Sequence, residues 1–211
     1  MSAVIAFSGG CYSGKTTTIE IVKDALIKCN YNVIVLSELL REITDESIDE
    51  LRKNPSKYLD LQFNIITKKM LQENKAFNDI SDVVYLADRA ITDSLFYLEN
   101  YVDKSKLSEQ DIERLCKLDS IVRSHAVKAF SEGYTSVLEF TPLQIKNKND
   151  KYRPKYLKHL SNYEYNAIHT LNLAYSYNRI NRKTFLKAFD LQIMQPEEIA
   201  KLVITKILKH Y

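Results

Sequence analysis

The sequence predicts an α/β fold in which a five-stranded parallel sheet is covered by helices on both faces. Short apolar runs rich in β-branched residues alternate with longer stretches of helical periodicity, the pattern of strands joined by helical crossovers. The chain has 211 residues, of which 45% are hydrophobic, enough for one large domain with a buried core. No internal repeat, low-complexity linker or change of composition divides the sequence. We therefore predict a single domain over residues 1–211.

Five runs have the composition of buried parallel strands, because each is short and apolar. They cover residues 4–7, 33–36, 83–87, 136–140 and 184–189. Glycines or polar residues follow several of these runs. In an open parallel sheet the carboxyl ends of the strands form the edge at which ligands bind. The residues just after each strand are therefore the first candidates for a functional site.

Helical spacing of apolar residues predicts the elements between the strands. The predicted helices cover residues 16–29, 57–77, 91–101, 108–131, 157–176 and 196 to the C-terminus, with one or two short helices between 37 and 52. Ser108 with Asp111 resembles a capping box in which aspartate replaces glutamate, and Gly133 ends that helix. Pro196 stands in the first turn of the last helix, where proline is tolerated.

Three of the four glycines, Gly9, Gly10 and Gly14, fall within six residues directly after the first strand. Lys15 and Thr16 complete the pattern G-x-x-x-x-G-K-[ST] of a phosphate-binding loop, or P-loop. Glycines let successive backbone N–H groups turn toward phosphate oxygens, and the following helix N-terminus adds partial positive charge. The predicted nucleotide-binding residues are Gly9, Gly10, Cys11, Tyr12, Ser13, Gly14, Lys15, Thr16 and Thr17.

This loop predicts two cofactors, ATP and Mg²⁺. Lys15 is expected to contact the β- and γ-phosphates as a catalytic residue, and the Thr16 hydroxyl to bind the metal. The alternative is a plain glycine turn followed by a chance Lys-Thr pair. The complete match, with a strand before it and a helix after it, favours the P-loop.

Asp88 and Arg89 follow the third strand at the same edge of the sheet. A carboxylate there can hold Mg²⁺ through water or orient a nucleophile. The planar fork of an arginine can clamp an acceptor phosphate or pin a neighbouring carboxylate. We predict that Asp88 is a catalytic and metal-binding residue and that Arg89 is a catalytic and acceptor-binding residue. An exposed helix cap is the alternative for the pair.

Glu38 follows the second strand and is predicted to project from the same edge. A carboxylate in that place can accept the proton of an attacking hydroxyl while positioning the oxygen. Glu38 is therefore a catalytic and acceptor-binding candidate. Arg41, one helical turn further, is predicted to bind the acceptor in the same cleft. An ordinary solvated helix start is the alternative.

A polar stretch over residues 143–156 follows the fourth strand, and residues 146–155 contain five basic side chains and one acid. Such a loop can close over a triphosphate, exclude water and supply charge to the transition state. We predict a short lid here, with Arg153 as its catalytic arginine. A solvated basic loop would have the same composition.

Taken together, these residues resemble the P-loop nucleoside and nucleotide kinases: the thymidylate kinase and deoxynucleoside kinase group, including nicotinamide-riboside-kinase-like AAA ATPase domains. Besides the P-loop, the similar segments are DRAITDSLFYLENY (88–101), EFTPLQIKNKNDKYRP (139–154) and NPSKYLDLQF (54–63). The resemblance implies that Gln62 and Phe63 bind the base of the acceptor, by paired hydrogen bonds and by stacking. A core aromatic beside a surface amide is the alternative for these two.

Two departures leave the acceptor open. Thymidylate kinases usually carry Arg-Glu-Pro-Gly where this chain has SELLR (37–41), and deoxynucleoside kinases carry Glu-Arg-Ser where it has Asp-Arg-Ala (88–90). We predict ATP-dependent phosphoryl transfer to a small nucleotide or nucleoside. A (deoxy)nucleoside monophosphate is preferred because Arg41 and Arg89 place two forked cations near one cleft. A nucleoside or nicotinamide riboside is the alternative acceptor.

Two other functional classes stay open. One is a regulatory P-loop ATPase or GTPase: residues 147–150 match the N-K-x-D guanine reader of switch GTPases, although no Asp-x-x-Gly follows the third strand. The other is a kinase acting on an end or a base of a nucleic acid. A net charge of +3 is too small to argue for a nucleic-acid partner by itself.

Composition excludes several further classes. Three widely spaced cysteines suggest neither a disulfide framework nor a zinc site, and fit a reducing, cytoplasmic setting. The apolar run at the N-terminus lacks the basic flank of a signal peptide, so we do not expect one. No apolar run approaches the roughly 20 residues that span a bilayer, so the sequence predicts no transmembrane helix. The 14 tyrosines are compatible with a homodimer face as well as with core packing.

Overall fold

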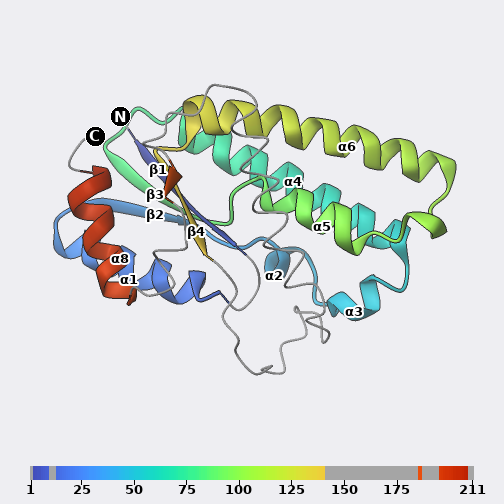
Figure 1. Ribbon diagram of the computed structural model, residues 1–211, viewed down its shortest axis with the longest axis horizontal. Coiled ribbons are helices and arrows are strands. Elements are labelled where there is room, and N and C mark those ends of the chain that lie inside the picture. Colours follow the sequence, from blue (N-terminus) through green and yellow to red (C-terminus); the bar gives the residue numbers. More distant parts are fainter. Residues whose placement is uncertain (1, 10–12, 141–184, 187–194, 209–211) are drawn as a thin grey trace.

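The computed structural model describes residues 2–9, 13–140, 185–186 and 195–208. Its sheet consists of β1 (Ala3–Gly9), β2 (Asn32–Leu36), β3 (Val83–Asp88), β4 (Ser136–Phe140) and β5 (Phe185–Leu186). Neighbouring strands are all parallel and follow the order β2-β3-β1-β4-β5 (Figure 1). The predicted α/β fold with a parallel sheet is confirmed. Four of the described strands have five to seven residues, and of the fifth predicted strand, 184–189, the structure describes Phe185 and Leu186 as β5.

The strand order places β1 between β3 and β4, in the middle of the sheet. Phe7 of β1 is in register with Asp88 of β3, and Gly9 with Phe140 of β4. These three strands therefore end close together, and the segments that follow β1 and β3 leave from neighbouring points. This edge is where the sequence placed the candidate site.

The helices follow the predicted order. The described helices are α1 (Lys15–Lys28), α2 (Leu40–Ile43), α3 (Ile48–Leu51), α4 (Pro55–Phe77), α5 (Asp93–Tyr101), α6 (Glu109–Lys128) and α8 (Pro196–Leu202), with a 3-10 turn at Lys104–Lys106 and π-helical turns at Ala129–Gly133 and Val203–Ile207. None of these described helices is both long and apolar enough to cross a membrane. The predicted helix over 157–176 lies outside the described residues.

Local capping explains where the long helices begin. Asn54 Oδ1 accepts a hydrogen bond from the backbone N–H of Lys57 at 3.1 Å, so α4 begins two residues before the predicted start, with Pro55 in its first turn. Ser108 Oγ accepts from the N–H of Asp111 at 3.1 Å, which confirms the predicted cap of α6.

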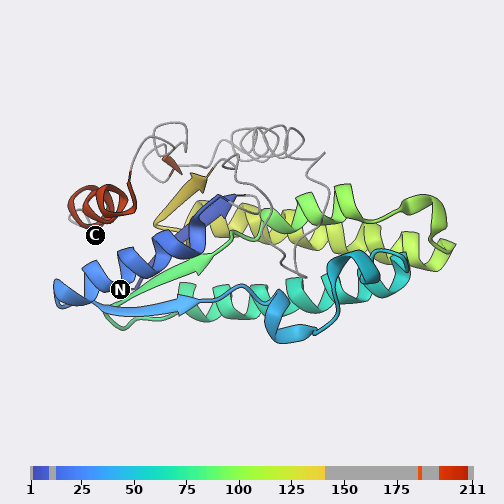
Figure 2. The same cartoon turned by 90° about the horizontal axis from the view of Figure 1, so that it is seen from below.

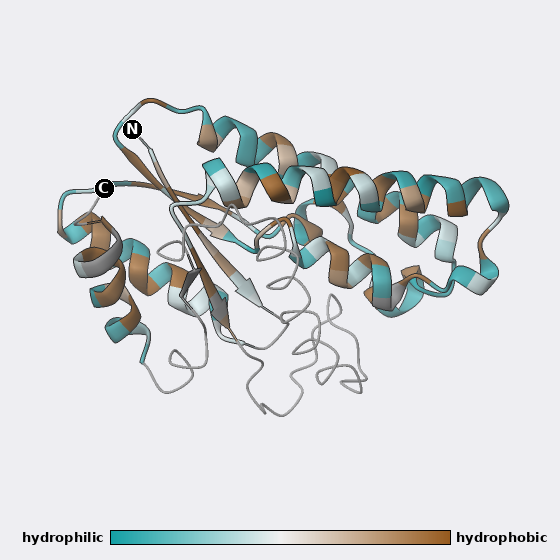
Figure 3. Cartoon of the chain, turned by 45° about the horizontal axis from the view of Figure 1, so that its top comes forward, coloured by the Kyte–Doolittle hydropathy of each residue, from teal (hydrophilic) through white to brown (hydrophobic). Residues whose placement is uncertain are grey.

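Helices cover both faces of the sheet, as predicted. α1 and α8 pack on one face, and α4, α5 and α6 lie together on the other (Figures 1 and 2). Each face of the sheet has its own hydrophobic core, and successive side chains of β1 point into one or the other. Val4 and Ala6 pack with α4 and α6, whereas Ile5 and Phe7 pack with α1 and α8. The strands are mainly coloured as hydrophobic, whereas hydrophobic and hydrophilic segments alternate along the long helices (Figure 3).

The prediction that 33–36 is a buried strand is wrong in one respect. β2 is the edge strand of the sheet, and Ile34 is 42% exposed. Val33 and Val35 are only half-buried. A continuous apolar run indicates a strand, but burial depends on the strand order, and the edge position exposes one side of this run.

The connection between α4 and β3 is fixed by one carboxylate. Asp79 Oδ1 accepts hydrogen bonds from the N–H and the hydroxyl of Ser81, at 2.9 and 2.6 Å, and Oδ2 accepts from the hydroxyl of Tyr85 at 2.6 Å. The hydrogen bonds from Ser81 and then from Tyr85 lower the pKa of Asp79 from 3.8 to about 2. The same contact raises the pKa of Tyr85 to about 12.

We expect this carboxylate to make stability depend on pH in the acid range. The folded-state pKa of about 2 lies below the ordinary 3.8, so the stabilisation is present above pH 3.8 and is lost as pH falls toward 2. The Asp79→Asn variant should therefore unfold at lower urea concentration than the parent protein at neutral pH, and the difference should shrink as the solution is acidified. Urea unfolding measured along a pH series checks this. The neighbouring exposed Asp82→Asn is the control, and an Asp79→Asn deficit that does not change with pH would contradict the prediction.

Candidate functional site

Two glycines of the P-loop have backbone conformations that suit glycine. Gly9 has a φ of 145° and Gly14 a φ of 80°, both in the region that L-residues with side chains rarely adopt. A Cβ atom at Gly9 would also lie 2.3 Å from the carbonyl oxygen of Phe140. The sequence therefore needs glycine here for both the turn and the close contact with β4. Gly10, Cys11 and Tyr12, predicted to bind nucleotide, lie outside the described residues.

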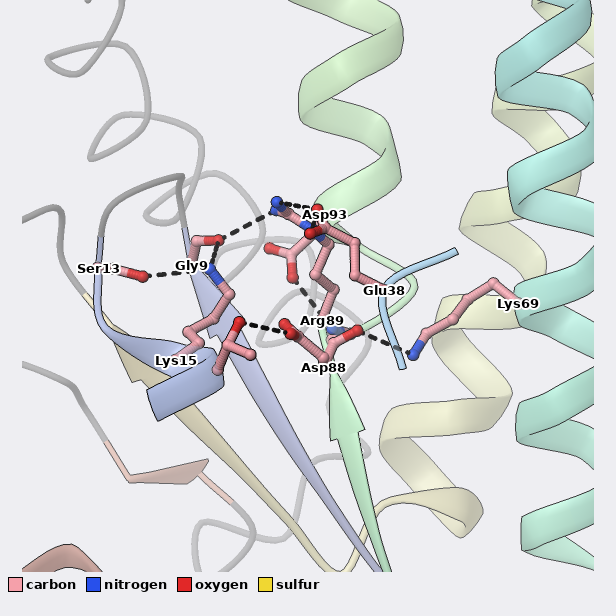
Figure 4. A network of polar contacts seen from close by, with 10 residues as sticks. Gly9, Ser13, Lys15, Glu38, Lys69, Asp88, Arg89 and Asp93 are labelled. Carbon is pink, nitrogen blue, oxygen red and sulfur yellow. Dashed lines mark hydrogen bonds and ion pairs between the residues drawn. The ribbon is translucent and has the colours of Figure 1, made fainter. Parts of the chain in front are cut away.

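Lys15 folds back over the loop that precedes it. Its side chain is buried, and Nζ donates to the carbonyl oxygen of Gly9 at 2.8 Å and to Ser13 Oγ at 3.1 Å (Figure 4). Lys15 is also the first residue of α1, with Gly14 at the N-cap in the left-handed conformation. An ammonium group and a helix N-terminus thus face the same loop, an arrangement that favours an anion.

Thr16 and Asp88 meet across the end of the sheet. The Thr16 hydroxyl donates to Asp88 Oδ2 at 3.0 Å, although the two residues are 72 positions apart. Asp88 is buried at the end of β3, and Thr16 is exposed in the first turn of α1. A hydroxyl and a carboxylate are the oxygen ligands that Mg²⁺ prefers, and Mg²⁺ usually keeps several waters beside one or two protein ligands. The donor set therefore fits this metal. Within the described part of the chain, no group of three or more His, Cys, Asp or Glu side chains forms a metal cage of another kind.

Arg89 pins Glu38. Its Nε and Nη2 donate to Glu38 Oε1 at 3.0 and 2.7 Å, and Nη1 donates to the carbonyl oxygen of Gly9 at 3.3 Å. The guanidinium lies 5.0 Å from the ring centroid of Tyr97 on α5. The sequence left two uses open for this arginine, an acceptor clamp or a partner for a carboxylate. In the structure its fork is directed at the carboxylate (Figure 4).

The turn that carries Arg89 is fixed by Asp93, which the sequence analysis missed. Asp93 Oδ1 accepts from the Ser8 hydroxyl at 2.8 Å, and Oδ2 accepts from the N–H of Ala90 at 3.0 Å. Arg89 itself has a φ of 78°, a strained conformation for a side-chain-bearing residue. The signal in the sequence is an acid in the first turn of a helix, five residues after Asp88. That signal is common at helix starts, so it did not single out this residue.

The remaining predicted residues are more dispersed. Arg41 is exposed on α2, and Thr17 is exposed on α1. On α4, Gln62 is 4% exposed whereas Phe63 is 45% exposed, because neighbouring residues on a helix point about 100° apart. The described contacts join Gly9, Ser13, Lys15, Thr16, Glu38, Asp88 and Arg89, and they do not join Gln62 or Phe63 to this group. Arg153 and the predicted lid lie outside the described residues.

Comparison with known proteins bears on the family and the fold of this chain. Residues 4–183 match the sequence model of the AAA domain family. The chain belongs to the AAA domain family. No curated protein sequence matches it. Among solved structures, it is similar to the NadR protein, crystallised in complex with NAD and AMP-PNP, with a TM-score of 0.63 and 17% sequence identity. The alignment covers 98% of this chain and 49% of the NadR chain, so the chain spans about half the length of that protein.

Family and fold together show a nucleotide-binding P-loop domain with an α/β parallel sheet. At 17% identity, the structural likeness extends to the fold alone. It does not separate the thymidylate kinase, deoxynucleoside kinase and nicotinamide-riboside-kinase-like groups that the sequence resembles.

Proposed function

We propose that this AAA domain is an ATP-dependent kinase that phosphorylates a hydroxyl group of a small acceptor of the nucleoside class. One observation carries the proposal. A second carboxylate, Glu38, is held beside the P-loop by Arg89, whose guanidinium also contacts the carbonyl of Gly9. A carboxylate in this place can take the proton of an attacking hydroxyl, and its ion pair with Arg89 fixes its position beside the P-loop.

The donor half of the site follows from the P-loop. We assign the triphosphate of ATP to the loop over residues 9–17, with Lys15 at its β- and γ-phosphates. Thr16 and Asp88 would hold Mg²⁺, which would supply positive charge to the transferred group. AMP-PNP in the NadR crystals supports a donor of the ATP type.

In the acceptor half, Glu38 serves as general base. An acceptor oxygen attacks the γ-phosphorus, the bond from the γ-phosphorus to the bridging oxygen of ADP breaks, and the hydroxyl proton passes to the Glu38 carboxylate. The products are the phosphorylated acceptor and ADP. Arg89 orients Glu38 through two donors to one oxygen.

This assignment changes the preferred acceptor. The sequence favoured a nucleoside monophosphate because Arg41 and Arg89 offered two forked cations. Arg89 directs its fork at Glu38, and Arg41 lies exposed on α2. The charge of Arg89 is thus already matched by a carboxylate, which favours a nucleoside without a phosphate group over a nucleoside monophosphate. NAD in the NadR crystals supports nicotinamide riboside as one such acceptor.

Several further roles remain part of the proposal. Gln62 and Phe63 would bind the base of the acceptor, and Arg153 would supply charge from a lid over about 143–156. The kinase domain would extend over residues 1–211 and act in the cytoplasm, as a monomer or a homodimer, without a membrane or nucleic-acid partner.

A transfer assay tests the proposal. The protein is incubated with ATP and Mg²⁺ and a panel of nucleosides, nicotinamide riboside, nucleoside monophosphates and a short oligonucleotide, and products are identified by mass. Phosphorylated nucleoside with equal amounts of ADP supports the proposal. Transfer to monophosphates alone would instead support the acceptor that the sequence favoured, a nucleoside monophosphate. Hydrolysis of ATP or GTP that no acceptor accelerates would instead favour a regulatory P-loop ATPase or GTPase. Phosphorylation of the oligonucleotide would favour a kinase that acts on nucleic acid.

A further inference from the structure

A buried polar cluster lies beside the candidate site and is used by none of the roles above. We call it the Glu73 cluster; its members are Lys69, Glu73, His125 and Tyr134, exposed by 5%, 0%, 7% and 5%. Glu73 Oε1 accepts from the Tyr134 hydroxyl at 2.5 Å, and Oε2 lies 3.0 Å from His125 Nε2. Lys69 Nζ lies 3.5 Å from Glu73 Oε1. The cluster joins α4, α6 and the segment before β4.

Two members of the cluster also reach the turn that carries Arg89. The Tyr134 hydroxyl accepts a hydrogen bond from the N–H of Ile91 at 3.0 Å. Lys69 Nζ approaches the carbonyl oxygen of Asp88 at 3.5 Å (Figure 4). The cluster therefore contacts the backbone on both sides of Arg89, before it at Asp88 and after it at Ile91.

Arg89 needs such support. Its φ of 78° lies in a sparsely populated region, and residues persist there only when their surroundings fix them. A relaxed backbone at this position would redirect the guanidinium away from Glu38, because the side chain follows the backbone. The charged and polar groups of the cluster are costly to bury where apolar residues could fill the same space between the helices. Their contact with the turn that carries Arg89 is a functional reason for burying these groups.

We propose that the Glu73 cluster positions Arg89, and through it the Glu38 carboxylate, so that Tyr134 and Lys69 are positioning residues of the site. Tyr134 is suited to this role because its hydroxyl donates to one group and accepts from another. Burial, and then the charge of Glu73, raise the pKa of Tyr134 well above its ordinary value, which keeps the hydroxyl protonated. The catalytic consequence rests on the proposed function, whereas the effect on the geometry of Arg89 does not.

The Tyr134→Phe variant tests the proposal, with Tyr85→Phe as the matched control. Both tyrosines are 5% exposed and donate to a carboxylate, but Tyr85 pairs with Asp79, in the connection before β3. Phenylalanine at 134 keeps the edge-on ring contacts with Phe77 and Phe130. The first readout is the Nε–H resonance of Arg89 in isotope-labelled protein, which reports its hydrogen bond to Glu38. We expect exchange of this proton with water to quicken about tenfold in Tyr134→Phe and to stay unchanged in Tyr85→Phe.

The second readout is catalysis. We expect Tyr134→Phe to lower kcat about tenfold with little change in KM for ATP, because a small displacement of a catalytic group slows transfer without weakening the donor site. In an Arg89→Lys background the same change should have much less effect on kcat, since Tyr134 acts through Arg89. Full additivity in this cycle would overturn the proposal, as would equal effects of Tyr134→Phe and Tyr85→Phe on Arg89.

The outcomes also separate this proposal from the proposed function. If the parent protein transfers phosphate to no acceptor, the proposed function fails while the resonance of Arg89 still tests the cluster. If Tyr134→Phe does not fold, Lys69→Met removes the contact with Asp88 from the other side of the turn. An unchanged Arg89 resonance in that variant would overturn the proposal.

Discussion

The Lys15→Ala variant is expected to lower kcat/KM for ATP by about 10²- to 10³-fold, the usual effect of removing one positioned donor to a transferred group. Lys15 is buried, and its ammonium already lies within 2.8 Å of the Gly9 carbonyl, at the centre of the loop. Alanine at this position removes the only part of the side chain that can reach phosphate oxygens. We expect both weaker binding of ATP and slower transfer, because the lysine contacts the phosphates before and during the reaction.

The measurement is ATP binding by calorimetry together with steady-state kinetics on the same preparations. Lys23→Ala is the matched control, since Lys23 lies on the same helix and pairs with Glu20 at the surface. That change should leave both quantities within error. Circular dichroism must show that Lys15→Ala is folded, because the ammonium also donates to Ser13. A folded Lys15→Ala variant with unchanged ATP affinity and turnover would remove the basis for every role assigned at this site.

The P-loop could be predicted from the sequence because its determinants are contiguous. Gly9, Gly14, Lys15 and Thr16 lie within eight residues, between a strand and a helix that periodicity identifies. The meeting of Thr16 with Asp88 was also predictable, since the carboxyl ends of parallel strands share an edge. The conformation of Arg89 was not, because the sequence gives no indication that a non-glycine residue has a φ of 78°.

The Glu73 cluster could not be predicted from the sequence for a different reason. Lys69 and Glu73 are spaced i, i+4 on α4, which in a sequence is typical of a solvated ion pair. Their partners His125 and Tyr134 come from elements more than 50 positions further along the chain. Only the packing of α4 against α6 turns this face inward and makes the pair part of a buried network.

The phase of α4 likewise decides the exposure of Gln62 and Phe63. The sequence treated the two as a pair, whereas the helix buries one and exposes nearly half of the other. The burial of β2 could not be predicted either, because its place at the edge depends on strand order rather than on its own residues.

The Glu38→Gln variant is expected to lower kcat about 10²- to 10⁴-fold, the range for loss of a positioned general base. Glutamine has nearly the shape of glutamate and can still accept a hydrogen bond from Arg89, but it cannot take the proton of the attacking hydroxyl. It also removes the charge that balances the guanidinium 2.7 Å away. KM for ATP should change little, since Lys15, Thr16 and Asp88 are untouched.

Kinetics with the best acceptor of the panel provide the measurement, and Glu42→Gln provides the control. Glu42 lies one turn further along, is exposed and accepts from the Ser37 hydroxyl at 2.6 Å, so its loss should leave kcat unchanged. Comparing transfer with acceptor-free ATP hydrolysis sharpens the test. A base for the acceptor is needed only in transfer, so Glu38→Gln should slow transfer far more than hydrolysis. Equal slowing of the two reactions would assign Glu38 to the nucleotide site, and the hydroxyl of the acceptor would then require a different base.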